Sequence, residues 1–277
     1  MNRKDASIVA IFWVFIFCNS IIACSLGNST PIQIVTQTQD TTNKFFWKQI
    51  NYDSSKQYIY LTFDDGPSNG TVSVFDLCKQ LGVKASFFMV GGQALTKNSK
   101  DIVNMVRNEY PQILLCNHSF SHANSKYVYF YHHPEMAAAD FYKSQLSLNV
   151  PFKIVRLPGN RAWIYQNEIK ASDLVKPVCI LLDNAGYNAI GWDIEWKFKH
   201  KNAHPIQTPE QMIAMVDSAF SRNETRTNNH IVILSHDRMF RDKNYTDSLA
   251  KFIMLLKQNS KYIFETVDHY PQLKPLQ

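Results

Sequence analysis

Apolar residues between positions 58 and 258 follow two alternating patterns. Short, nearly continuous apolar runs predict strands at Tyr58–Phe63, Ala85–Val90, Ile113–Cys116, Ile154–Leu157, Ala189–Trp192 and Ile231–Leu234. Between these runs, apolar residues recur at helical spacing and predict helices near 71–81, 99–109, 134–148, 167–176, 209–222 and 245–258. Apolar strands that alternate with helices predict a parallel sheet covered by helices, and the even repeat favours an α/β fold of the (β/α) barrel kind.

The first 27 residues have the pattern of a secretory signal peptide. Basic Arg3 and Lys4 precede an apolar run, residues 8–17, that is too short to span a membrane. The following Ile21-Ile22-Ala23-Cys24 resembles a bacterial lipoprotein signal, which implies cleavage before Cys24 and lipidation of its thiol. An ordinary signal peptide or an uncleaved anchor is the alternative. We therefore expect an exported protein of the cell envelope, on the periplasmic or surface side, held to a membrane by lipid.

The rest of the chain divides by composition into a tether and one domain. Residues 28–51 are rich in Thr, Gln and Asn and have few apolar residues, which is typical of a flexible tether. Residues 52–270 have ample apolar and aromatic content for a core and the ordinary length of a single domain. The sequence therefore predicts one catalytic domain behind a tether.

Charge and cysteine content indicate which binding partners and which disulfides to expect. The net charge is +6, but Lys and Arg are scattered without a dense run, so we expect mild attraction to anionic surfaces and no nucleic-acid site. With Cys18 removed and Cys24 lipidated, Cys78, Cys116 and Cys179 remain in apolar surroundings. This pattern favours buried thiols, with one bridging pair as the alternative. No obligate protein partner is evident in the sequence.

Residues that could do chemistry follow directly after the predicted strands. They are Asp64 and Asp65; Asn117, His118 and His122; Pro158 and Gly159; Asp193, Glu195 and Trp196; and Ser235, His236 and Asp237. In a parallel barrel the carboxyl ends of the strands meet at one rim, where active sites lie. The sequence therefore predicts a single site at this rim.

Asp64 and Asp65 end the first apolar run and precede Gly66-Pro67. If Phe63 is the last strand residue, both acids lie on the turn that Gly66-Pro67 enforces, where neither is buried alone. A surface turn without function is the alternative.

His118 and His122 are four residues apart and would meet on one side of a helical turn. With an aspartate from the same rim they form the two-nitrogen, one-oxygen ligand set of a catalytic zinc ion that keeps a position open for water. The second acid of the Asp64-Asp65 pair would then be the base that takes the proton of that water. His236 is the candidate general acid, with a structural histidine as the alternative.

Two further segments border the predicted rim. Residues 127–133 form an aromatic cluster that is either a sugar-stacking platform or half-buried packing, and we favour packing. His200 lies in a basic loop, residues 197–201, and we expect it in solvent.

Five short motifs, in this order, resemble those of the polysaccharide deacetylase family, the metal-dependent carbohydrate esterases of family 4 with a NodB homology domain. The motifs are Thr62-Phe63-Asp64-Asp65-Gly66-Pro67, His118-Ser119-Phe120-Ser121-His122, Arg156-Leu157-Pro158, Gly191-Trp192-Asp193-Ile194-Glu195-Trp196 and Leu234-Ser235-His236. The resemblance spans about residues 58–237. It implies a distorted (β/α) barrel of the NodB type with its active site at the C-terminal ends of the strands.

The resemblance also implies a role for individual residues. It implies Asp64 as catalytic base, Asp65, His118 and His122 as metal ligands, Arg156 as the partner that orients the base, His236 as acid and Leu234 as a wall of the acetyl pocket. The implied cofactor is one divalent metal ion, Zn²⁺ in the first place, with Co²⁺ or Ni²⁺ as alternatives.

The chain departs from the family pattern at two places. The third motif is followed by Gly159, where the family commonly has tyrosine, so the backbone N–H that would help hold an oxyanion is kept and an aromatic wall is lost. The fourth motif usually ends in Asp-Trp. Here either Glu195 replaces that aspartate beside Trp196, which the resemblance places at the substrate, or Asp193 takes its role.

The function implied is removal of acetyl groups from N-acetylhexosamine units of a cell-envelope polysaccharide or glycolipid, with release of acetate. One alternative is an inactive glycan-binding lipoprotein on the same scaffold. Another is a two-carboxylate glycosidase, which would use Asp64 and Glu195 and leave the histidine pair idle.

Overall fold

A curled β-sheet lies at the centre of the protein, whose computed structural model describes residues 47–166 and 168–276. The predicted signal peptide, Cys24 and most of the predicted tether lie outside these residues. Among the described residues, no helix is both long and apolar enough to cross a bilayer.

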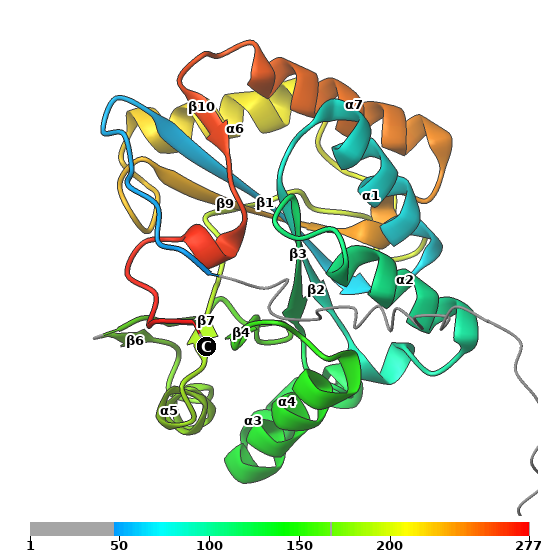
Figure 1. Ribbon diagram of the computed structural model, residues 1–277, viewed down its shortest axis with the longest axis vertical. Helices are drawn as coiled ribbons and strands as arrows, with labels where there is room; N and C mark the ends of the chain where they lie inside the picture. The colour runs from blue at the N-terminus through cyan, green and yellow to red at the C-terminus, as the bar shows by residue number, and fades with distance from the viewer. Residues whose placement is uncertain (1–46, 167, 277) are drawn as a thin grey trace, which may run out of the picture. The chain divides into compact units, whose positions relative to one another are not determined.

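The longest strand, β1, runs through the interior of the sheet between β2 and β9 (Figure 1). The strand order is β6-β5-β7-β4-β3-β2-β1-β9-β8, and β10 pairs with the start of β1. The strands are β1 Gln57–Gly66, β2 Ala85–Met89, β3 Ile113–Asn117, β4 Ile154–Val155, β5 Trp163–Ile164, β6 Ile169–Lys170, β7 Asn188–Ala189, β8 Ile194–Glu195, β9 His230–His236 and β10 Tyr262–Phe264. All pairings are parallel except those of β5 with β6 and β7.

The path of paired strands ends at β6 and at β8. No pairing among the described strands joins these two ends, so the sheet is a half barrel with an open side. The predicted distorted barrel is confirmed in this open form.

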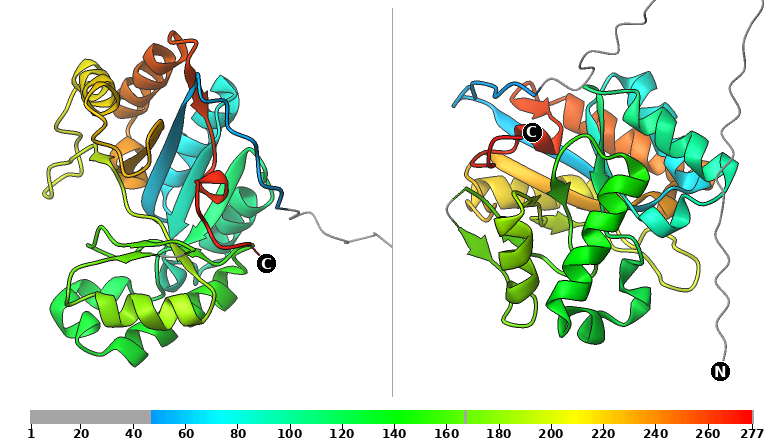
Figure 2. Two further views of the ribbon diagram at one scale, coloured as in Figure 1. Left: turned by 90° about the vertical axis from the view of Figure 1, so that its left-hand side faces the viewer. Right: turned by 60° about the horizontal axis from the view of Figure 1, so that its bottom comes forward.

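Strand β1 sends alternate side chains to two cores. Ile59, Leu61 and Phe63 join the core between the sheet and the helices α1, α2, α6 and α7, whereas Tyr58 and Tyr60 enter a second core on the opposite face. A third core joins α3, α4 and α5 to β4 and β7, and Figure 2 shows α4 and α5 packed together. The helices are α1 Asn69–Leu81, α2 Lys97–Arg107, α3 Tyr127–Tyr131, α4 Pro134–Leu148, α5 Lys176–Asn184, α6 Pro209–Ser221 and α7 Lys243–Lys257. Short 3₁₀ segments, η1 to η4, cover Gly91–Gln93, His122–Ser125, Asp237–Phe240 and Val267–His269.

One predicted helix, near 167–176, is wrong. This part of the chain forms β6 and a turn, and the helix α5 begins where the prediction ends, at Lys176. The reason is Pro177, which lacks a backbone N–H and is therefore accommodated in the first turn of a helix, not near its end.

The three cysteines of the domain are buried and free. Cys78, Cys116 and Cys179 form no disulfide, which confirms the expectation of buried thiols over a bridge. Burial raises the pKa of Cys78 to about 12, so its thiol is protonated at neutral pH and acts as a small apolar group.

Candidate active site

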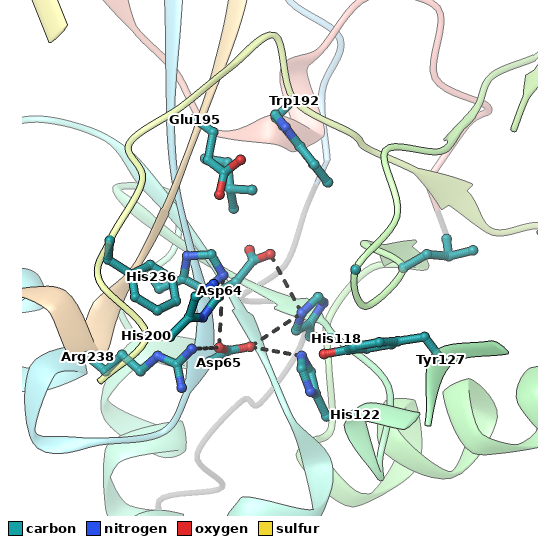
Figure 3. A pocket seen from close by; sticks show the side chains of 14 residues that line it. Asp64, Asp65, His118, His122, Tyr127, Trp192, Glu195, His200, His236 and Arg238 are labelled. Atoms are coloured by element: carbon teal, nitrogen blue, oxygen red, sulfur yellow. Dashed lines mark ion pairs between the residues drawn. The ribbon is translucent and has the colours of Figure 1, made fainter. Parts of the chain in front are cut away.

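The two adjacent acids reach one pocket because β1 is irregular at its end. The strand continues to Gly66, three residues beyond its predicted end, so the expectation that both acids lie on a turn is corrected. Asp64 still pairs in register with Phe88 and His236, whereas the register shifts between Asp64 and Gly66, and Asp65 has a left-handed φ of 74°. In a regular strand neighbouring side chains point to opposite faces, but this bulge turns both carboxylates into the same pocket (Figure 3).

His118 and His122 meet across a left-handed turn that follows β3. Both imidazoles line the pocket, but the backbone between and after them is not a helical turn, which corrects the sequence-based expectation. Ser119 and the four residues from His122 to Ser125 all have positive φ. The turn is held by the hydroxyl of Ser119, which accepts the backbone N–H of His122 at 3.1 Å.

The tautomer of His118 follows from its surroundings. Its Nδ1 lies 2.9 Å from the carbonyl oxygen of Arg156, and because a carbonyl can only accept, Nδ1 carries the proton. The Nε2 lone pair is then free to face the pocket. Burial lowers the pKa of His118 to about 3, so the imidazole is neutral, as a metal ligand must be.

Asp65, His118 and His122 fit a divalent metal ion. One ligand atom of each lies within 4.8 Å of the other two. The Oδ1 of Asp65 lies 3.1 Å from Nε2 of His122 and 3.6 Å from Nε2 of His118. This oxygen is buried and has no hydrogen-bond partner among the described residues, so it is a carboxylate oxygen left for a cation.

Asp64 is held by a fully buried arginine. Arg156 donates to Oδ1 of Asp64 and to the hydroxyl of Thr62, both at 2.8 Å, and to the carbonyl oxygens of Ile190 at 3.0 Å and Gly191 at 2.8 Å. Burial raises the pKa of Asp64, although the guanidinium opposes this shift. A fixed carboxylate with a raised pKa is well suited to accept a proton.

His236 lies opposite Asp64 across the β1–β9 ladder. Its Nε2 is 3.9 Å from Oδ2 of Asp65, and the ring of Phe198 packs edge-on against it. Burial lowers the pKa of His236 against the attraction of Asp65 and Asp64. An imidazolium with a lowered pKa releases its proton readily, as a general acid must.

These groups line one cavity of about 340 Å³, drawn in Figure 3. Leu234 and Gly159, both predicted from the sequence, also line it. The full lining is Asp64, Asp65, His118, His122, Tyr127, Leu157, Gly159, Trp192, Glu195, Phe198, His200, Leu234, His236 and Arg238. Carboxylates and imidazoles thus form the floor of a cavity with apolar and aromatic walls.

Trp196 lies elsewhere, which corrects its predicted place beside the substrate. Its side chain is fully buried against Phe240 and Phe252, and its Nε1 donates to the carbonyl oxygen of Gln207 at 2.9 Å. Neighbouring side chains of an extended chain point to opposite faces. Glu195, the last residue of β8, therefore lines the pocket, and Trp196, the next residue, enters the core on the other face. Trp192 is the tryptophan that lines the cavity.

The two acids of the fourth motif have different surroundings. The buried carboxylate of Asp193 accepts the backbone N–H groups of Arg226 at 2.6 Å and Val232 at 2.7 Å, so it holds the start of β9. Glu195 lines the cavity. In the described part of the chain, neither carboxylate has an ion pair or hydrogen bond with His236.

We expect two substitutions to separate the roles of these acids. Asp193→Asn should lower the free energy of unfolding by about 1–3 kcal/mol, because the amide nitrogen of Asn cannot accept the second N–H, and should leave turnover by the folded protein unchanged. Glu195→Gln should lower kcat/KM by about tenfold or more with stability unchanged. Urea unfolding and steady-state kinetics measure both, and the reverse pattern would assign the fourth-motif role to Asp193.

The structure adds pocket residues that the sequence reasoning missed or set aside. Arg238 was missed: its Nη2 lies 3.4 Å from Oδ2 of Asp65, and its guanidinium stacks on Phe198 at 4.7 Å. Its place two residues after His236 was the available signal. Tyr127 is half-buried against the third core and His200 is exposed, as expected, and both also line the cavity.

Comparisons with known proteins were consistent with these motifs. Residues 51–158 match the family model described as polysaccharide deacetylase. A chitin disaccharide deacetylase from Vibrio alginolyticus is 25% identical over 78% of this chain and 72% of its own length. A peptidoglycan-N-acetylglucosamine deacetylase from Bacillus cereus is 31% identical over 39% of this chain and 40% of its own length.

Solved structures support the same fold. The catalytic domain of a peptidoglycan N-acetylglucosamine deacetylase from Eubacterium rectale superposes with a TM-score of 0.56 at 22% identity, covering 83% of this chain and 97% of that domain. A CE4 esterase from Streptococcus mutans gives a TM-score of 0.57 at 23% identity, covering 76% and 86% of the two chains. At these identities the likeness concerns the fold.

Proposed function

We propose that this chain, which matches the polysaccharide deacetylase family over residues 51–158, is a metal-dependent hydrolase that removes acetyl groups from N-acetylhexosamine units of a cell-envelope polysaccharide or glycolipid. One observation carries the proposal: Asp64, fixed by the buried Arg156, faces the same cavity as the ligand set Asp65, His118 and His122. A base beside a metal site is the arrangement that amide hydrolysis by water requires.

Each of these cavity residues has its own role in the proposed reaction. A divalent ion on the three ligands would supply Lewis acidity for the acetyl carbonyl and a lowered pKa for water. Asp64 takes the proton of the attacking water, and Arg156 keeps the accepting oxygen in place. The backbone N–H of Gly159 stabilises the negative charge that develops on the acetyl oxygen. His236 protonates the departing amine, and acetate leaves.

The cofactor we propose is Zn²⁺, with Co²⁺ or Ni²⁺ as alternatives. Two imidazoles and one carboxylate form the ligand set of many catalytic zinc sites, and the remaining position suits water or substrate. We further propose that lipid on Cys24 holds the protein to a membrane, so that the domain acts on envelope glycans. Cys24 lies outside the described residues, and its motif Ile21-Ile22-Ala23-Cys24 supports this proposal.

Metal removal provides the direct test of the proposed function. The protein loaded with Zn²⁺ should release acetate from at least one of peptidoglycan, poly-N-acetylglucosamine and N-acetylglucosamine oligomers. Activity should disappear after dialysis against a chelator and return when one equivalent of Zn²⁺ is added. Enzymatic acetate determination and metal analysis measure both outcomes.

Two results would contradict the proposal. Shortened glycan chains without free amines would indicate a glycosidase that uses Asp64 and Glu195. Glycan binding without acetate release, by protein that holds one metal ion, would indicate an inactive binding protein on the same scaffold.

A further inference from the structure

Tyr127 occupies the wall of the cavity next to Gly159. It is the first residue of α3, the short helix that follows the left-handed turn of His122. Its ring meets the ring of His122 edge-on, with centroids 5.9 Å apart and an angle of 81° between the planes. The side chain therefore lies between the cavity with the predicted metal site and the edge of the third core, which takes Phe130 and Tyr131.

This ring packs closely against Gly159, where a side chain would crowd it. A Cβ at that position would lie 3.3 Å from Cε1 of Tyr127, 3.4 Å from Cδ1 and 3.5 Å from Cζ. Gly159 also has a left-handed φ of 66°, which residues with a side chain rarely adopt. Gly159 thus lines the cavity without a side chain and leaves the adjoining space to the tyrosine ring.

The hydroxyl of Tyr127 is directed at the reacting centre. Figure 3 shows this end of the side chain pointing toward His118 and His122. In the described part of the chain the hydroxyl has no hydrogen-bond partner. A tyrosine hydroxyl ordinarily titrates near pH 10, about three units above neutral, so the group keeps its proton and can donate it in a hydrogen bond.

We propose that the Tyr127 hydroxyl donates a hydrogen bond to the acetyl oxygen as negative charge develops on it, beside the N–H of Gly159. This inference rests on the proposed function. A donor placed where charge appears in the transition state stabilises that state more than the bound substrate. Tyr127 would then be a catalytic residue, one that the motifs do not reveal because it comes from α3.

The alternative is that the ring only stacks on a sugar. Tyr127→Phe separates the two roles, because it keeps the ring and removes the hydroxyl. We expect kcat for acetate release from an N-acetylglucosamine tetramer to fall by about 10- to 100-fold with KM within about twofold. Affinity for a methylphosphonate analogue of the tetramer, which imitates the tetrahedral oxyanion, should fall by a similar factor.

Tyr129→Phe is the matched control, because Tyr129 lies on the same helix and is 58% exposed. It should leave kcat, KM and analogue affinity unchanged, and both variants should keep the native melting temperature and Zn²⁺ affinity. The inference is overturned if Tyr127→Phe retains kcat and analogue affinity, if only KM rises, or if the native protein does not bind the analogue. If the native protein binds the analogue but releases no acetate from any glycan, the proposed function is contradicted instead. In that case the inference is still tested by whether Tyr127→Phe binds the analogue more weakly than the native protein.

Discussion

Asp64→Asn is expected to slow acetate release by about 10²- to 10⁴-fold while the protein still binds one equivalent of Zn²⁺. The amide has the shape of the carboxylate and can still accept the hydrogen bond from Arg156, so the buried guanidinium keeps a partner. It cannot take a proton from water. Steady-state acetate release and metal analysis of the purified variant measure the two parts of this expectation.

Asp76→Asn is a suitable control, because Asp76 lies on the exposed side of α1. It should leave both rate and metal content unchanged. If Asp64→Asn retains native activity, Asp64 is not the base, and the proposed division of the Asp64-Asp65 pair is wrong.

Arg156→Met is expected to lower the free energy of unfolding by about 3–5 kcal/mol. The substitution leaves the carboxylate of Asp64 buried without its countercharge and removes the donor to the carbonyl oxygens of Ile190 and Gly191. Acetate release should also be lost, because the base is no longer oriented. Urea unfolding followed by circular dichroism measures the change in stability.

The exposed Arg222 provides the control, since Arg222→Met removes only an ion pair of 4.0 Å at the surface and should change stability by about 0.5 kcal/mol or less. Adding Asp64→Asn to Arg156→Met should restore part of the lost stability, because the buried group is then neutral. If the double variant is less stable than the sum of the single changes implies, charge burial does not explain the loss.

The elements that could be predicted from the sequence are those long enough to show a repeated pattern of buried apolar residues. The helix 134–148 was predicted with the bounds of α4, and the helix near 209–222 with bounds that differ from those of α6 by one residue at its end. Strands β5, β6 and β8 have two residues each, too few to show a period of two. Their pairing is decided by contacts between distant parts of the chain, which a local pattern does not contain.

The residues of the site were predictable because the carboxyl ends of parallel strands converge. Asp64, Asp65, His118, His122 and His236 all reach one cavity, as their places after apolar runs indicated, while their roles stay predictions. The bulge at Asp65 and the left-handed turn at His122 were not predictable, because neither uses glycine at its positive φ. The same limit applied to Tyr127, which packs against Gly159, 32 positions further along the chain.

Because of the bulge in β1, the neighbouring residues Asp64 and Asp65 differ in the substitutions that they can tolerate during evolution. Asp65 stands outside the regular ladder on a left-handed backbone, which Gly or Asn adopts easily, so either replacement would remove a proposed metal ligand and leave the sheet paired. At position 64 most replacements leave the buried Arg156 without its countercharge and lower the stability of the fold. A descendant that gives up catalysis but keeps a glycan-binding groove is therefore expected to lose Asp65 first.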